Sequence, residues 1–207
     1  MVSRVEPEKR DAIVAAAAKA FSRWGFRKTS VEEIARAAGV AKGTVYLGCT
    51  SKRDLFYRAV LLDLERWNAE LARVIDPTRP ADALLVDLAR EAVASVDRYP
   101  LARGLLMGEV EQDLPDWAEH LDELRAHGLS TVLEVLRLGV LQGRLRADLD
   151  LEATAGVLLD LVATTIMYHS RGPDPGPRLA RRAAALFDVV TRGIVVPAAV
   201  PSEEPVA

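Results

Sequence analysis

Residues 29–56 form the part of the chain whose pattern restricts the fold most. They predict a short helix, a glycine turn and a second short helix, followed at once by the start of a long helix. Ser30 with Glu33 forms a capping-box signal for the first helix, and Ser51 gives the start signal for the long one. Gly39 ends the first helix, because a turn between steeply crossed helices needs a residue that adopts positive φ. Helices this short are marginal alone, so packing must hold them.

The second short helix carries small, polar and basic residues rather than a core pattern. Lys42, Thr44 and Tyr46 are expected together on its surface, and nothing in a packed core requires that combination. A DNA major groove does require it, because the groove admits a helix whose polar side chains reach bases and phosphates. The alternative interpretation is an ordinary solvated helix face.

The charge distribution separates the N-terminal part from the rest of the chain. Residues 1–60 contain twelve Lys and Arg against six Asp and Glu, a net charge of +6. The remaining residues carry fifteen against twenty-four, a net charge of −9, and all five lysines lie within the first 52 residues. A basic N-terminal part attached to an acidic body indicates a polyanionic partner at one end only.

Helical periodicity runs through the rest of the chain, where strand signals are nearly absent. We therefore expect an all-α protein with a three-helix helix-turn-helix domain at residues 1–52. A helical bundle is expected at residues 53–195, and the composition of residues 196–207 predicts a disordered tail. Outside the helix-turn-helix segment, the expected helices cover residues 7–24, 52–75, 81–98, 101–111, 115–142, 151–169 and 178–194.

Missing signals exclude several classes of protein. The single cysteine, Cys49, cannot form a disulfide framework or a cysteine zinc site, and we interpret it as a small buried residue rather than a redox sensor. There is no charged-then-apolar leader, and the longest apolar stretch, residues 155–168, contains Asp160 and is too short for a bilayer of ~30 Å. We expect a cytoplasmic protein without a membrane partner. No phosphate loop, nucleophile elbow or His-Glu-x-x-His motif indicates an enzyme, and no cofactor is expected.

The N-terminal part of the chain resembles the TetR family of bacterial transcriptional regulators. The resemblance covers roughly residues 8–60, and beyond them it is only architectural. The matching motifs are Phe21-Ser-Arg-Trp-Gly-Phe26, Thr29-Ser30, Ile34-Ala35-x-x-Ala38-Gly39-Val40, Gly43-Thr44-Val45-Tyr46 and Ser51-Lys52-x-Asp54-Leu55. The resemblance implies a DNA-binding transcriptional regulator with a C-terminal helical ligand-binding and dimerisation bundle. It further implies a repressor that a small hydrophobic effector releases from a palindromic operator.

The same resemblance implies which residues meet the double-stranded DNA. Lys42 and Thr44 would face bases or phosphates, and Tyr46 would reach the backbone. Thr29 and Lys52 would touch phosphates at the starts of their helices, where free N–H groups and the helix dipole favour an anion. The residues assigned to this surface are Thr29, Ser30, Lys42, Gly43, Thr44, Tyr46 and Lys52.

The chain departs from the family pattern directly after Tyr46. The family usually continues with any residue, an aromatic residue that contacts phosphate and a phenylalanine that fills the core. Residues 47–49 are Leu, Gly and Cys instead. Glycine in a helix costs about 0.5–1 kcal/mol. Cysteine in place of phenylalanine leaves volume to fill unless Trp24 or Phe56 moves in.

An apolar effector pocket in the body follows from the resemblance. Its expected walls and polar anchors are Trp67, Met107, Trp117 and Tyr168, with Arg103, His120 or His127. A metal site is the alternative use of one face of the long helix, which carries Asp116, His120, Glu123 and His127. The spacing of the two histidines separates them by about 10.5 Å along the helix, too far to bind one ion, so no metal site is predicted.

Two adjacent apolar stripes near the C-terminus predict a homodimer through a four-helix bundle. The residues assigned to this interface are Leu158, Val162, Leu186 and Val190. Two alternatives to a ligand-responsive repressor stay open. One is a helical small-molecule binder or enzyme whose DNA binding is impaired by Gly48 and Cys49. The other is a constitutive DNA-binding protein whose body admits no ligand.

Overall fold

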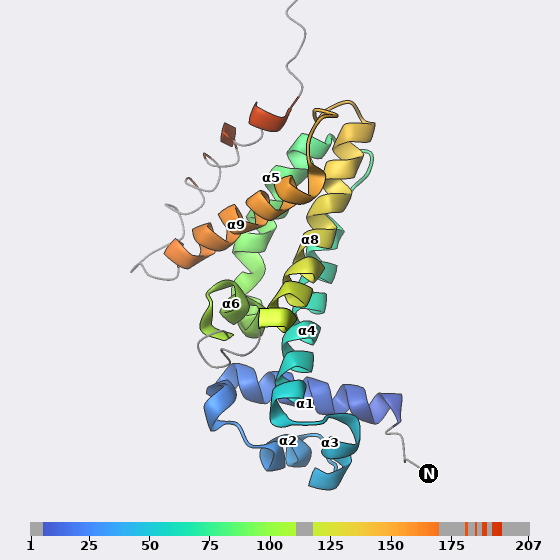
Figure 1. Cartoon of the computed structure of the whole chain (residues 1–207), viewed down its shortest axis with the longest axis vertical. Helices are drawn as coiled ribbons and strands as arrows, with labels where there is room; N and C mark the ends of the chain where they lie inside the picture. Colours follow the sequence, from blue (N-terminus) through green and yellow to red (C-terminus); the bar gives the residue numbers. More distant parts are fainter. Residues whose placement is uncertain are drawn as a thin grey trace, which may run out of the picture.

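The computed structural model describes residues 6–110, 118–169, 181, 185, 188–189 and 192–195, and helices make up most of them (Figure 1). The helices are α1 (Pro7–Lys28), α2 (Val31–Ala37), α3 (Lys42–Gly48), α4 (Lys52–Leu71), α5 (Ala81–Ser95), α6 (Pro100–Leu106), α8 (Ala118–Leu141) and α9 (Leu151–His169). Two short 3-10 turns, η1 (Ala72–Val74) and η2 (Val96–Arg98), extend α4 and α5. The expected all-α class is confirmed.

Local signals in residues 29–56 produce the predicted helix-turn-helix. The Oγ of Ser30 accepts from the backbone N–H of Glu33 at 3.2 Å, and a Glu33 carboxylate oxygen accepts from the Ser30 N–H at 2.9 Å. Gly39 adopts φ 68° at the turn, a conformation that side chains with a Cβ rarely take. At the start of α4, the Oγ of Ser51 accepts from the N–H of Asp54 at 3.0 Å. Helices α2 and α4 thus begin at the capping residues that the sequence indicates.

The end of α1 differs from the expectation. Gly25 interrupts the helix with φ 75° and ψ 169°, and one further turn follows it. Phe26, which that turn carries, packs its ring 5.1 Å from Phe56 and 6.1 Å from Phe21. Trp24, one of the two residues that could have filled the volume left by Cys49, is 55% exposed. After the break at Gly25, Phe26 rather than Trp24 packs against the core.

The long helix α4 connects the N-terminal unit, α1 to α3, with the rest of the molecule. It leaves the N-terminal unit and runs into the body beside α8 (Figure 1). Its buried side includes Val60, Leu64, Trp67 and Leu71, which repeat at helical spacing, and α1, α6 and α8 pack against it. A single rigid element therefore spans both parts of the protein.

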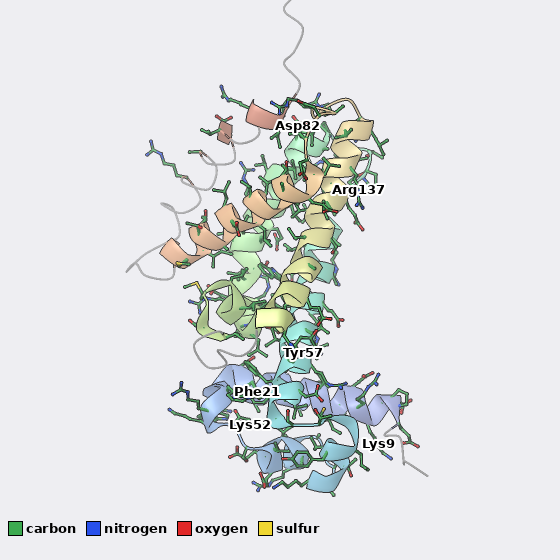
Figure 2. All side chains as sticks on the ribbon, in the orientation of Figure 1. Lys9, Phe21, Lys52, Tyr57, Asp82 and Arg137 are labelled. Atoms are coloured by element: carbon green, nitrogen blue, oxygen red, sulfur yellow. The ribbon has the colours of Figure 1, made fainter. Side chains whose placement is uncertain are left out.

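The far end of the body is held by polar contacts between α5 and the turn after α8. The guanidinium of Arg144 binds both carboxylate oxygens of Asp82 at 3.0 and 2.9 Å, and Figure 2 shows Asp82 at this end. The side chain of Gln142 accepts from the first N–H of α5 at 3.0 Å. Across residues 6–110 and 118–169, no helix has the length and apolar character needed to span a bilayer.

Candidate nucleic-acid interface and internal cavity

The outer face of α3 presents the side chains that the sequence assigned to DNA. Lys42 and Tyr46 are exposed, and Thr44 is partly exposed. Val45 is buried between them and ties the helix to the core of the N-terminal unit. Leu47 is 56% exposed on the same short helix, which adds an apolar group of the kind that contacts thymine methyl groups. The side chains of Lys42, Thr44 and Tyr46 are thus all at least partly accessible on α3.

Lys42 forms an ion pair across the two helices of the helix-turn-helix. Its Nζ donates to a carboxylate oxygen of Glu32 on α2. The hydrogen bond to Glu32 raises the pKa of Lys42, and the same bond lowers the pKa of Glu32. Both groups are therefore charged at neutral pH, and the positive charge of Lys42 is locally balanced.

Lys52 opens α4 next to the end of α1. Its Nζ lies 4.5 Å from the centroid of the Phe26 ring and 3.5 Å from the backbone carbonyl oxygen of Arg27 (Figure 2). A cation held against an aromatic face is restricted in direction at little cost in hydration. Lys52 is thereby positioned at the start of a helix, where an anion is favoured.

Thr29 does not have the environment expected of a phosphate ligand. Its side chain is 2% exposed, and its hydroxyl donates to the carbonyl oxygen of Gly25 at 2.8 Å. The carbonyl oxygen of Ala20 lies 3.3 Å away from the same hydroxyl. The assignment of the Thr29 side chain to the DNA surface is therefore corrected: the side chain satisfies carbonyl groups at the end of α1. Neighbouring Ser30 is partly exposed at the start of α2.

Cys49 lies inside the N-terminal unit, where the family pattern places a phenylalanine. The residue is 4% exposed, and burial raises the pKa of its thiol, which disfavours the reactive thiolate. Phe56 and Phe21, which belong to the same core, meet edge to face with ring centroids 4.9 Å apart. The core of this unit thus rests on aromatic groups from α1 and α4. Gly48 ends α3 in a partly exposed position.

An apolar cavity of about 230 Å³ lies in the body between α4, α5, α8 and α9. Most of its lining is aliphatic, contributed by leucine, valine and alanine side chains. The polar residues among the lining are Asn68, Thr131 and Asp160. The Trp67 indole forms part of the wall, and its N–H donates to the buried Oγ of Ser95 at 2.8 Å. Because that donor is satisfied, Trp67 presents an apolar surface to the cavity.

The residues predicted to form the pocket are placed in different parts of the molecule. Trp67 lines the cavity. Arg103 and Met107 lie at the C-terminal end of α6, outside the lining, and Arg103 lies instead against a groove beside the end of α1. His120 packs its ring 4.9 Å from that of Tyr57 on α4. None of these three residues is among the described residues that line the cavity.

The remaining pocket and metal assignments fall on parts that the structure leaves out. Trp117 and Asp116 lie outside the described residues, and so do the side chains of His127 and Tyr168. Glu123, the other member of the proposed metal set, accepts a hydrogen bond from the hydroxyl of Tyr57 at 2.7 Å. Among the side chains that the structure does place, no cluster of three or more His, Cys, Asp or Glu has metal-binding geometry.

Two polar contacts at the boundary between the N-terminal unit and the body were not foreseen. Tyr57 links α4 to α8 through Glu123, and Figure 2 shows Tyr57 where α4 leaves the N-terminal unit. Asp63 on α4 is 7% exposed, and its carboxylate accepts from the N–H groups of Leu101 and Ala102 at 2.9 and 3.2 Å. A carboxylate within an apolar stripe was the available signal for Asp63. The cavity residues Asn68 and Thr131 gave no comparable signal.

The face of α9 assigned to dimerisation points into the subunit. Leu158 and Val162 are 4% and 8% exposed within the single chain, and both line the cavity. They cannot also provide the exposed apolar surface of an interface, so this assignment is corrected. Val157, on the opposite side of the helix, is 56% exposed. Leu186 and Val190 lie outside the described residues, although Val189 between them is 70% exposed.

Comparison with known proteins gives a family match at the N-terminal unit. Residues 13–59 match the model described as bacterial regulatory proteins, tetR family. The HTH-type transcriptional regulator TtgR of Pseudomonas putida is 28% identical over 190 residues, which cover 84% of this chain and 87% of TtgR. The transcriptional repressor KstR2 of Rhodococcus jostii is 24% identical, with 79% of this chain and 81% of KstR2 covered. RutR of Escherichia coli is 32% identical over a shorter region, 55% of this chain and 53% of RutR.

Solved structures share the whole architecture. A TetR-family regulator from Mesorhizobium loti superposes with a TM-score of 0.71 at 25% identity, covering 91% of this chain and 98% of that one. FadR of Bacillus subtilis, solved in complex with stearoyl-CoA, has a TM-score of 0.69 at 18% identity and covers 89% of this chain and 98% of FadR. The N-terminal unit and the helical body therefore occur together in proteins of this type.

Proposed function

The chain belongs to the TetR family of bacterial transcriptional regulators, and we propose that it is a dimeric repressor that leaves its operator when a small apolar molecule enters the cavity. It is a DNA-binding transcriptional regulator with a helix-turn-helix N-terminal unit. The observation that carries the proposal is the apolar cavity of about 230 Å³, whose wall includes the long helix that begins at the DNA-binding unit.

The proposed DNA surface is the outer face of α3 with the starts of α2 and α4. Lys42, Thr44 and Tyr46 enter the major groove, and Gly43 leaves room for close approach of the helix start. Ser30 and Lys52 lie at helix N-termini, whose free N–H groups favour phosphate. The side chain of Thr29 is not part of this surface.

The lining of the cavity supports an uncharged effector. No lysine, arginine or histidine occurs among the described residues that line it. An anion would lose its hydration there without a cationic partner, at a cost that an apolar ligand does not incur. A cavity of about 150 Å³ elsewhere holds benzene, so this one suits a substituted ring or a short branched hydrocarbon. FadR was solved with an acyl-CoA, but the phosphates of such a ligand would find no cation among these residues.

Coupling between cavity and DNA is proposed to run along α4. Leu64, Trp67 and Asn68 of α4 line the cavity, and Lys52, which we assign to the phosphates, is the first residue of the same helix. A ligand that presses on the cavity end displaces the helix and changes the separation of the two recognition helices in the dimer. Its effect is limited to its differential affinity for the two states, typically 1–3 kcal/mol.

The proposed dimer uses the outward side of α9. The exposed Val157 provides apolar surface there, and Val189, near the end of the chain, is a second exposed apolar residue. Single apolar residues on a surface are ordinary, but a two-fold axis places each beside its copy. This arrangement keeps the four-helix bundle expected from the sequence and changes the face that forms it.

The test measures DNA release and ligand binding together. Fluorescence anisotropy of a duplex from upstream of the protein's own gene is recorded with neutral naphthalene and, as matched control, with charged 2-naphthoate. We expect naphthalene to raise the melting temperature and weaken DNA binding about 5- to 150-fold, while naphthoate does neither. Saturating DNA must weaken naphthalene binding by the same factor. Equal naphthalene affinity with and without DNA would contradict the proposed coupling.

A further inference from the structure

The helix-turn-helix surface holds a carboxylate that the sequence did not assign to binding. Glu32 occupies the second position of α2, and its Oε1 accepts a hydrogen bond from the Nζ of Lys42, the first residue of α3. The side chains of Glu32 and Lys42 are 52% and 51% exposed. The two charges therefore lie side by side on the surface, each from a different helix.

Capping of α2 does not account for Glu32. The capping box uses Glu33, whose carboxylate accepts from the N–H of Ser30. An additional acid in the first turn interacts favourably with the helix dipole. It also repels phosphate at the place where a helix start would otherwise attract it. A carboxylate at this position therefore lowers affinity for any DNA unless a base compensates it.

The loss of DNA affinity that Glu32 causes is large relative to the total charge of the helix-turn-helix. Residues 31–48 contain two cations, Arg36 and Lys42, and two acids, Glu32 and Glu33, so their net charge is zero. The attraction of this segment for phosphates is correspondingly weak, and Glu32 balances the one cation at the start of the recognition helix. Attraction to phosphates supplies the non-specific affinity of a protein for DNA. Residues 31–48 are therefore expected to contribute little affinity unless they contact bases.

We propose that Glu32 and Lys42 read one G·C base pair as a unit, which makes Glu32 a specificity-determining residue; this rests on the proposed placement of α3 in the major groove. Guanine offers two acceptors, N7 and O6, to an ammonium, and the paired cytosine offers its N4 amino group to a carboxylate. The ion pair places the donors of the Lys42 ammonium beside the acceptor of the Glu32 carboxylate. This order matches the major-groove edge of a G·C pair, where two acceptors lie beside one donor. In an A·T pair the N6 amino group replaces O6, and a donor then opposes the ammonium.

Two variants with the same change in charge separate this role from simple electrostatics. Glu32→Ala removes the carboxylate at the second position of α2. Glu8→Ala removes a carboxylate at the second position of α1, so the helix position and the change in net charge are matched. Bound duplexes are selected from a random pool with each protein at about 150 mM salt. Affinities are then measured on the selected duplex, on its G·C to A·T variants and on a random duplex.

The wild-type protein is expected to select a G·C pair at one symmetric position in each half-site and to lose about ten- to a hundredfold in affinity when that pair becomes A·T. Glu32→Ala should abolish this preference and bind the random duplex about three- to tenfold more tightly, with a salt slope steeper by about one. Glu8→Ala should keep the preference. In Lys42→Ala, the further change Glu32→Ala should no longer alter base preference.

Two results would overturn the inference in distinguishable ways. If the wild-type protein binds DNA and Glu32→Ala retains its full base preference, the carboxylate does not read a base, although the protein remains a DNA-binding regulator. If the wild-type protein binds none of the duplexes even at about 50 mM salt, the proposed DNA surface fails and the inference fails with it. The melting temperature of each variant is measured as well, so that a loss of folding is distinguished from a loss of DNA binding.

Discussion

The hydroxyl of Thr29 lies inside the N-terminal unit, where it donates to the carbonyl oxygen of Gly25 at 2.8 Å. A threonine before a helix has the same sequence signature whether its hydroxyl turns outward to an anion or inward to a carbonyl. Here the break at Gly25 frees a carbonyl group at the end of α1, and the buried hydroxyl satisfies it. A buried acceptor without a donor is costly, so this contact stabilises the end of α1.

Thr29→Val tests this role, because valine keeps the shape and lacks the hydroxyl. We expect the free energy of unfolding to fall by about 1–2 kcal/mol, while DNA affinity well below the melting temperature stays within about twofold. Thr29→Ser, which keeps the donor, is the control and should lose less stability. A variant with unchanged stability and weakened DNA binding would instead support the phosphate role that the resemblance implied.

Helices α4 and α6 are joined by the buried carboxylate of Asp63. It accepts from the N–H groups of Leu101 and Ala102, two of the unpaired donors at the start of α6. Burial raises the pKa of Asp63 above its ordinary value of 3.8, opposed by those two N–H donors. The folded state therefore favours the protonated form. The protonated Asp63 carboxyl therefore contributes to the stability of the folded state at pH values below 3.8. This contribution is lost as the pH rises through the higher pKa of Asp63 in the folded protein.

Substitution of Asp63 should separate hydrogen bonding from charge. Asp63→Asn keeps an acceptor for the start of α6 and removes the buried charge, so its stability relative to the wild type should improve as the pH rises above 3.8. Asp63→Ala should lose about 1–3 kcal/mol at neutral pH, because two buried N–H groups lose their acceptor. Chemical denaturation at several pH values measures both. If the free energies of unfolding of Asp63→Asn and the wild type differ by the same amount at every pH, the raised pKa of Asp63 is not the cause of the difference.

In the whole molecule, the cavity and the proposed dimer surface occupy different sides of α9. Leu158 and Val162 face inward to the cavity, while Val157 faces outward. In the proposed dimer, a single helix would therefore separate the effector from the partner subunit. In the proposed dimer, α9 would contact the ligand on one side and the partner subunit on the other. A shift of this helix could therefore accompany the change between the DNA-bound and the released state.

Val157→Glu is expected to give monomers, because two carboxylates would be buried face to face across the two-fold axis. Sedimentation at micromolar concentration measures the oligomeric state, and Val157→Ala is the control that keeps a small apolar surface. The monomer should fold, since Val157 is 56% exposed in the single chain. Its DNA affinity should fall to that of a single half-site. If Val157→Glu and Val189→Glu both sediment as dimers, the subunits meet elsewhere.

The positions of the short helices follow from the amino-acid sequence because the groups that define them are close in the chain. Ser30 and Glu33 form the expected reciprocal hydrogen bonds, and Gly39 takes the expected positive φ. The outward placement of Lys42 and Tyr46 also follows, since the alternation of buried and exposed positions on a helix depends only on its period. The family resemblance rests on this same local segment.

The cavity and the direction of individual side chains depended on contacts between residues far apart in the chain. His120 and Glu123 share a helix face in the sequence, yet Tyr57 on α4 sets the environment of both. Two sides of α9 carry apolar residues, and only packing against α5 and α8 selects the side that is buried. Local periodicity specifies a face but not its partner, because the partner is chosen by the shape and apolar area of helices that the sequence pattern does not place in space.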